Sequence, residues 1–260
     1  MKSNLTYLHL LTALHTGGSA DEGNMMGIAR EVHTEFPYLP ASSVRGKIRS
    51  ELEPETGAGI FFGQKIKDGQ QPTEGEVWFA DATLLFFPIA SLSHHLVWIT
   101  CPLWLERWNR WLDKTPLQSL IAECRENISE ETPVLVSFSP EDLYLQTALL
   151  KDTEIKQLEN LTNFSQLING LAPNSGLIKN LLKKLVVLSD EDCLALVEIG
   201  LQREVRVALN EEEKTVKGGS FRSEEAIPPE TVLFFPWGMK PAKQPEETKL
   251  IRKKLLEMLN

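Results

Sequence analysis

The stretch from Phe36 to Glu53, FPYLPASSVRGKIRSELE, constrains the fold of this 260-residue chain more than any other. Its first residues are predicted to be extended, because a proline restricts the residue before it to extended backbone. Directly after Pro40, the apolar residues Val44, Ile48 and Leu52 recur at helical spacing. The pattern therefore predicts an extended segment that passes straight into a helix with one buried face.

The start of this predicted helix combines hydroxyl groups with cations. Ser42 or Ser43 can cap the helix, and Arg45, Lys47 and Arg49 crowd its first two turns. Cations oppose the helix dipole at this end, so helix stability does not explain them. We interpret the cluster as a site for a polyphosphate chain, which would meet backbone N–H groups, hydroxyls and cations together. The alternative is a solvated basic face on an ordinary surface helix.

A glycine-rich segment lies upstream, over residues 15–27, and begins HTGGS at His15. It is predicted to be a loop whose backbone can approach a ligand closely, the alternative being a set of tight turns. Together with the serine and basic stretch, this segment resembles the RAMP superfamily of CRISPR effector proteins. The narrower resemblance is to the backbone subunit of type III-B (Cmr) complexes, the fourth Cmr subunit. Further segments carry the resemblance in the family's order: Phe61-Phe62-Gly63, Gly75 through Ala82 into LLFFPIASLSHHLVWITCPLWLERW, and REVRVALNEEEKTVKGGSFRSEEAIPPETVLFF.

The order of strand-like and helix-like segments predicts an α+β fold with a predominantly antiparallel sheet. The resemblance implies a modified ferredoxin-like (RRM-like) palm with an inserted helical subdomain and a thumb β-hairpin. We expect one RAMP-type domain over residues 1–260, with the helical insertion at 139–188 and the thumb hairpin at 210–225. Trp104, Trp108 and Trp111 form a stripe on a predicted helix, which indicates core packing, with stacking on bases as the alternative.

Composition limits the functions open to the chain. A hydrophobic content of 42% and a charged content of 24% are typical of a globular protein. The net charge of −9 argues against a general nucleic-acid binder, so an RNA site has to be a local basic groove. The longest apolar run, Leu84 to Ala90, is too short to span a bilayer, and no signal peptide is visible. We expect a cytoplasmic protein with no membrane partner.

The cysteines predict neither a disulfide framework nor a metal site. Cys101, Cys124 and Cys193 are odd in number, widely spaced and in apolar surroundings. We expect buried free thiols, no protein-bound metal, and no stably bound cofactor.

The family resemblance implies partners and RNA contacts. Its members stack head to tail along a CRISPR RNA, which implies CRISPR RNA, target RNA, neighbouring copies of the chain and other type III effector subunits as partners. The candidate RNA-binding residues are glycines, hydroxyls and cations: Gly17, Gly18, Arg30, Ser42, Ser43, Arg45, Lys47, Arg49, Arg206, Lys214 and Lys217.

The resemblance also raises the question of target-RNA cleavage. In the family pattern, a catalytic aspartate lies six residues before the acidic residue matched here by Glu31, and that position is Met25. A thioether neither takes a proton at neutral pH nor holds a hard cation. Asp21 or Glu22 could supply the carboxylate if the register differs, and His15 is a candidate acid or base. A divalent cation (Mg²⁺ or Mn²⁺) is expected only if cleavage occurs.

Three functions therefore remain open. The chain is expected to be a guide-RNA-binding backbone subunit of a type III antiviral effector. The same subunit acting as a target-RNA endonuclease is the alternative, and a protein–protein adaptor without RNA binding is the third.

Overall fold

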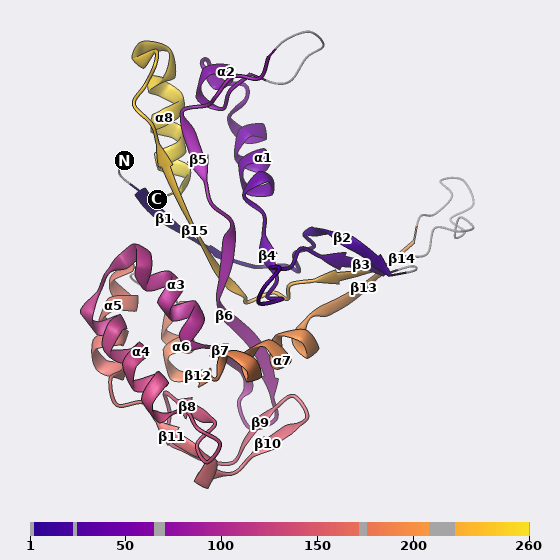
Figure 1. The fold of residues 1–260 in the computed structure, drawn as a ribbon, viewed down its shortest axis with the longest axis vertical. Coiled ribbons are helices and arrows are strands. Elements are labelled where there is room, and N and C mark those ends of the chain that lie inside the picture. The colour runs from indigo at the N-terminus through magenta and orange to yellow at the C-terminus, as the bar shows by residue number, and fades with distance from the viewer. Residues whose placement is uncertain (1–2, 23–24, 65–70, 172–175, 208–221, 260) are drawn as a thin grey trace. The chain divides into compact units, whose positions relative to one another are not determined.

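The computed structural model describes residues 3–22, 25–64, 71–171, 176–207 and 222–259 (Figure 1). Contacts within the chain divide it into two compact units, which are described separately. Strands β6 and β15 each contribute residues to both units. None of the helices in the described ranges is long and apolar enough to cross a membrane.

The first unit joins both ends of the chain to the segment from Tyr38 to Thr83. Its strand β15 pairs with β1 and, in antiparallel register, with β5. The short strand β4 pairs with the beginning of β6. The elements of this unit are β1 (Ser3–His9), β4 (Tyr38–Leu39), α1 (Ala41–Leu52), α2 (Ala58–Phe61), β5 (Val77–Phe79), β15 (Val232–Met239) and α8 (Pro245–Leu259).

Helix α1 confirms the predicted passage from an extended segment into a helix. Val44, Ile48 and Leu52 are all buried, as their spacing predicted. The predicted cap by Ser42 or Ser43 is wrong, because the helix begins at Ala41, before both serines, and no side chain caps it. Both serines lie exposed in the first turn.

Two of the segments that carry the family resemblance, Phe61-Phe62-Gly63 and the segment that begins at Gly75, lie in close backbone contact. Phe61 and Phe62 are fully buried, and Gly63 follows them with a φ of +82°. A Cβ at Gly75 would lie 2.7 Å from the backbone of Phe62, so only glycine fits there. The N–H of Glu76 then donates to the carbonyl oxygen of Phe61 at 2.7 Å. These residues are therefore needed for packing.

Glu76 itself is a buried charge that fastens helix α8. Its carboxylate accepts from the Arg252 guanidinium at 2.6 Å and from the backbone N–H of Lys243 at 2.6 Å. Arg252 also lies over the Phe61 ring, 5.5 Å from its centroid. Burial by itself raises the pKa of Glu76, but the hydrogen bonds from Arg252 and Lys243 outweigh burial and leave this pKa below its ordinary value.

The second unit contains His9–Pro37 and Leu84–Leu233. Its main sheet has the order β6-β7-β12-β8-β11, and a separate hairpin pairs β9 with β10. Antiparallel pairings predominate in the described chain, and parallel pairs occur between β7 and β12 and between β8 and β11. The strands are β2 (Gly17–Glu22), β3 (Met25–Ile28), β6 (Ala82–Ser91), β7 (His95–Thr100), β8 (Val134–Val136), β9 (Leu143–Leu145), β10 (Ala148–Leu150), β11 (Ile155–Gln157), β12 (Leu185–Leu188), β13 (Gln202–Arg206) and β14 (Arg222–Ala226). The helices are α3 (Pro102–Leu112), α4 (Thr115–Asn127), η1 (Asp152–Glu154), α5 (Leu161–Leu171), α6 (Gly176–Lys183) and α7 (Asp190–Gly200).

Two of the three tryptophans in the predicted stripe pack into the core. Trp104 and Trp108 on α3 are fully buried, whereas Trp111 is 45% exposed. Trp104 meets Phe36 edge to face at a centroid distance of 5.0 Å, and Trp108 meets Phe164 at 6.4 Å. Stacking on bases is therefore excluded for Trp104 and Trp108.

Residues 139–188 are less helical than their composition predicts. The segment contains α5 and α6, but also β9, β10, β11 and β12. Leu143 and Leu145 are buried in a strand, although leucine also favours helices. Short apolar runs do not distinguish the two structures, which is why the composition misleads here.

The cysteines are buried free thiols, as predicted. Burial raises the pKa of Cys124 to about 12, and burial also raises the pKa of Cys193. Such thiols are unreactive at neutral pH.

Candidate nucleic-acid interface

A four-stranded sheet in the second unit brings together two segments that lie far apart in the sequence. Its order is β13-β14-β3-β2, and Figure 1 shows the four strands side by side. The outer pairs β13–β14 and β3–β2 are antiparallel, and the central pair β14–β3 is parallel. The sheet thus joins the glycine-rich segment to the strands that flank the predicted thumb.

The glycine-rich segment is a pair of strands, so the prediction of a loop is wrong. Gly18 explains the difference, since a Cβ there would lie 2.6 Å from the carbonyl oxygen of Ile28 on the partner strand. Glycine is needed here because two backbones approach each other, and not because a ligand does. At Gly17 a Cβ would meet no atom within 4 Å, so this glycine has open space beside it.

The register of these strands places the candidate catalytic positions. Glu22 stands directly opposite Met25, and Asp21 stands opposite Met26. On the other side of β3, Ser223 is aligned with Met25. The backbone therefore brings Glu22 beside the position at which the family pattern has its aspartate.

His15 and Arg30 converge on Glu225. Nδ1 of His15 donates to the carbonyl oxygen of Glu225 at 2.7 Å, which leaves Nε2 of this tautomer as an acceptor. Arg30 Nη2 lies 3.3 Å from the Glu225 carboxylate, and Nη1 pairs with Glu198. Burial lowers the pKa of Arg30, but the bonds to Glu198 and Glu225 raise it by more. Arg30 is therefore held by two carboxylates of the second unit.

Arg206 is also paired, with Glu224 at 3.0 Å and Glu204 at 3.2 Å. Arg222 lies across from it and pairs with the same Glu224 at 2.9 Å. The sequence analysis missed Arg222 and Glu224. Their alternation in FRSEE, matched by REVR in the opposite strand, is the signal that could have revealed a charged face.

The cations of α1 do not form one cluster. Helical geometry places Arg45 and Arg49 about 40° apart and Lys47 about 160° from each. Lys47 pairs with Glu51 at 2.5 Å, whereas the Arg45 guanidinium donates to the carbonyl oxygen of Phe62. Nε of Arg49 is buried and has no hydrogen-bond partner among the described residues.

The two serines of α1 also lie on different sides of the helix. Ser42 lies on the side of Arg45 and Arg49, and Ser43 lies on the side of Lys47. The α1 candidates belong to the first unit, and the sheet candidates belong to the second. The last two candidates, Lys214 and Lys217, lie outside the described residues.

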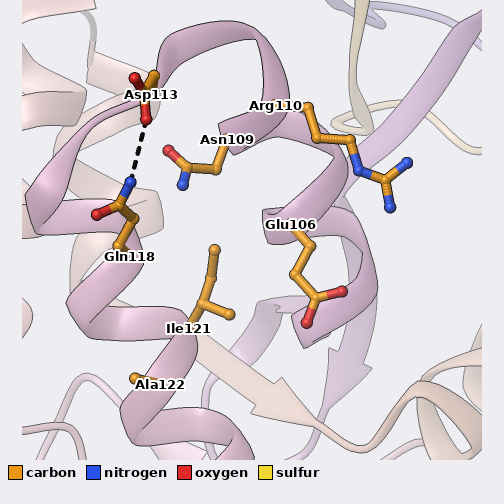
Figure 2. A pocket seen from close by; sticks show the side chains of 7 residues that line it. All are labelled: Glu106, Asn109, Arg110, Asp113, Gln118, Ile121 and Ala122. Atoms are coloured by element: carbon orange, nitrogen blue, oxygen red, sulfur yellow. Dashed lines mark hydrogen bonds between the residues drawn. The ribbon is translucent and has the colours of Figure 1, made fainter.

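An open hollow of about 640 Å³ lies between α3 and α4 (Figure 2). The amide of Gln118 donates to the carboxylate of Asp113 at 3.1 Å along its wall. None of the candidate residues lines this hollow. Within the described ranges, no three or more His, Cys, Asp or Glu side chains are grouped to hold a metal ion.

Comparison with known families decides the relationship. The family described as the RAMP superfamily matches residues 7–260, nearly the whole chain. The chain belongs to the RAMP superfamily. Within the superfamily, it is a Cmr4-like subunit of the kind found in type III-B Cmr complexes.

The similar proteins and structures are named either as Cmr4 or as part of a type III-B Cmr complex. The "CRISPR system Cmr endoribonuclease Cmr4" of Pyrococcus furiosus is 26% identical over 242 residues, which cover 90% of this chain and 80% of that protein. The crystal structure of oligomeric Cmr4 from the same organism has a TM-score of 0.68 and 23% identity, covering 98% of this chain and 89% of that one. The type III-B Cmr-beta complex bound to cognate target RNA contains a chain with a TM-score of 0.71 and 20% identity, covering 99% and 90%. The mixed α+β fold is thus the fold of these RAMP structures.

Proposed function

We propose that this RAMP protein is a guide-RNA-binding backbone subunit of a type III-B CRISPR effector complex that acts in antiviral defence. The observation that carries the proposal is the family match over residues 7–260, together with relatives that are named as Cmr4. Its partners are CRISPR RNA, target RNA, neighbouring copies of itself and other type III effector subunits. The similar crystal structure is described as oligomeric and the similar complex as bound to target RNA, which supports these partners.

The finer fold is part of this proposal. A modified ferredoxin-like palm carries the thumb hairpin, at residues 210–225, and the helical insertion, at residues 139–188. The antiparallel pairing of β13 with β14, from Gln202 opposite Ala226 to Arg206 opposite Arg222, supports a hairpin in this part of the chain. Residues 210–221 of the proposed thumb lie outside the described residues. Helices α5 and α6 support the helical insertion.

RNA binding is tested on the purified full-length protein. Expressed together with its complex partners and a guide RNA, the subunit should retain small RNA through purification and give a high ratio of absorbance at 260 nm to that at 280 nm. Phosphate contacts position an RNA without reading its sequence, so unrelated RNAs should bind about equally. A preparation that is free of RNA, and that binds none when RNA is added at low salt, would favour the adaptor function instead.

Target-RNA cleavage is the second candidate, favoured by the name endoribonuclease of the Pyrococcus furiosus relative. In our proposal Met25 leaves this subunit with cleavage that is absent or greatly reduced, while RNA binding is intact. Cleavage, where it occurs, requires Mg²⁺ or Mn²⁺ held by a carboxylate beside the scissile phosphate. In the tautomer that donates from Nδ1, Nε2 of His15 is an acceptor, which suits an acid or base.

The variant Met25→Asp tests this second candidate. It should raise divalent-dependent cleavage of bound target, because a carboxylate returns to the family's position directly opposite Glu22. Met25→Asn is the matched control, since asparagine is close in size to aspartate but carries no charge. Regular cleavage by the natural sequence that is lost in Asp21→Ala or Glu22→Ala would show instead that an upstream carboxylate carries the chemistry.

A further inference from the structure

A buried carboxylate joins two half-exposed arginines at the last described residue pair of the β13–β14 ladder, Arg206 and Arg222. One oxygen of Glu224 lies 3.0 Å from Nε of Arg206, and the other lies 2.9 Å from Nε of Arg222. The Glu224 side chain is 5% exposed, whereas the side chains of Arg206 and Arg222 are 54% and 55% exposed. The carboxylate therefore lies beneath the two guanidinium groups.

Strand register explains why these three residues meet. Arg206 is the direct partner of Arg222, and Glu204 is the direct partner of Glu224. Because residues two apart on a strand share a face, all four side chains lie on one face of the hairpin. Two like charges directly opposite each other repel, so the arginine pair needs a nearby anion. Glu224 supplies one anion from below.

The geometry points to a phosphate-binding clamp, in which Arg206 and Arg222 grip one phosphodiester of an RNA backbone and Glu224 is the positioning residue. This inference rests on the proposed function and adds a defined contact to it. A guanidinium carries five N–H donors, and Glu224 uses only the Nε donor of each arginine. Glu204 takes one further donor, on Nη2 of Arg206. No other hydrogen bond of these two guanidinium groups is formed with the described residues, and the remaining donors suit bidentate binding of a phosphate.

The position of the clamp within the sheet follows from the strand register. Strand β14, which carries Arg222 and Glu224, pairs directly with β3, where Met26 is aligned with Glu224 and Met25 with Ser223. Because consecutive residues of a strand alternate between its two faces, the clamp lies on the face of the sheet opposite to position 25. The clamp is therefore a phosphate contact separate from the candidate cleavage position.

The competing explanation is that Glu224 and Glu204 merely neutralise the two arginines. The two explanations predict opposite changes in RNA affinity when Glu224 is replaced by glutamine. If the carboxylates only mask the cations, replacing either by glutamine removes a negative charge and strengthens RNA binding. If Glu224 positions the clamp, Glu224→Gln weakens RNA binding, because its amide accepts from one Nε and presents an N–H to the other.

The test measures fluorescence anisotropy of a labelled single-stranded RNA with the full-length protein at several salt concentrations. Arg206→Ala and Arg222→Ala should each weaken binding and reduce the slope of log K against log salt by about 0.7. Arg203→Ala is the matched control, because this exposed arginine lies on the other face of β13. Glu224→Gln should weaken binding several-fold, Glu224→Asp should restore part of it, and Glu204→Gln should not weaken it. Circular dichroism checks that each variant is folded.

Two results would overturn the clamp while leaving RNA binding by the subunit intact. One is a Glu224→Gln variant that binds RNA as tightly as the natural protein or more tightly. The other is a loss in Arg203→Ala equal to that in Arg206→Ala. Absence of RNA binding by the natural protein itself at low salt would instead reject the proposed function, and the clamp with it.

Discussion

Single residues show why a count of cations does not define an RNA site. Arg30 and Lys47 both match the expected pattern, yet each is already paired with a carboxylate of the chain. Arg49, in contrast, has a buried Nε without a hydrogen-bond partner among the described residues. A buried donor of this kind is costly unless something binds it. We therefore expect the arginine side of α1, and not its lysine side, to contact phosphate.

This expectation separates two variants of α1. The double variant Arg45→Ala/Arg49→Ala should weaken binding of unrelated RNA sequences about equally and reduce the salt slope by about 1.4, or 0.7 for each cation. Lys47→Ala should change the slope much less, because Lys47 points to the other side of the helix and pairs with Glu51. The measurement is a salt titration of RNA affinity. Equal slopes for the double variant and the natural protein would contradict the assignment.

At the residue scale, sequence reasoning found side chains but not their partners. The burial of the Cys124 thiol was predictable, because Leu117, Leu120 and Cys124 recur at helical spacing and form the buried side of α4. The pairing of Arg206 with Glu224 depends on which strands lie together, and strand register is not visible in one sequence. The cap predicted for Ser42 failed because Pro40 occupies the N-cap position and the helix begins at Ala41.

Elements whose apolar residues recur at a regular spacing were predicted correctly. Elements that depend on close contacts between backbones were not. Helix α1 is fixed by the spacing of Val44, Ile48 and Leu52, which the structure buries together. Strand β2, GGSADE, has no apolar period, and its pairing with β3 depends on Gly18 fitting against Ile28. Glycine-rich sequence is typical of loops, so the strand pair was taken for one.

Helix α8 offers a prediction at this scale, because a buried ion pair fastens it. Glu76→Gln should lower the free energy of unfolding by about 3 kcal/mol at pH 7, the lower end for a buried pair, since the Arg252 side chain is 19% exposed and loses its counter-charge. Chemical denaturation measures the change. Glu74→Gln is the matched control, because Glu74 pairs with Lys240 at the surface and its loss should change stability little.

The pH dependence of this effect follows from the lowered pKa of Glu76. A carboxyl whose pKa is lower in the folded state stabilises the protein above its unfolded pKa and loses that contribution as the pH falls through the folded pKa. The difference in stability between the natural protein and Glu76→Gln should therefore be constant from pH 7 to about pH 5 and shrink at lower pH. A difference that grows on acidification would contradict the role given to this ion pair.

For the whole molecule, an acidic net charge is compatible with the proposed RNA binding if the cations that contact RNA are concentrated in a few places. The net charge is −9, and the candidate cations include those on α1 and the Arg206–Arg222 pair of β13 and β14. A backbone subunit needs only a few phosphate contacts per copy, because neighbouring copies on one RNA add theirs. A heterologous contact between copies that does not close then produces an open stack.

The most direct test of the backbone function is to count the copies bound as the RNA is lengthened. Native mass spectrometry of the full-length protein with guide RNAs of increasing length gives this number for each complex. A backbone subunit should add one copy for each fixed increment of RNA length, up to the limit of the strand. A copy number that does not change with RNA length, or closed two-fold dimers at every length, would contradict the account.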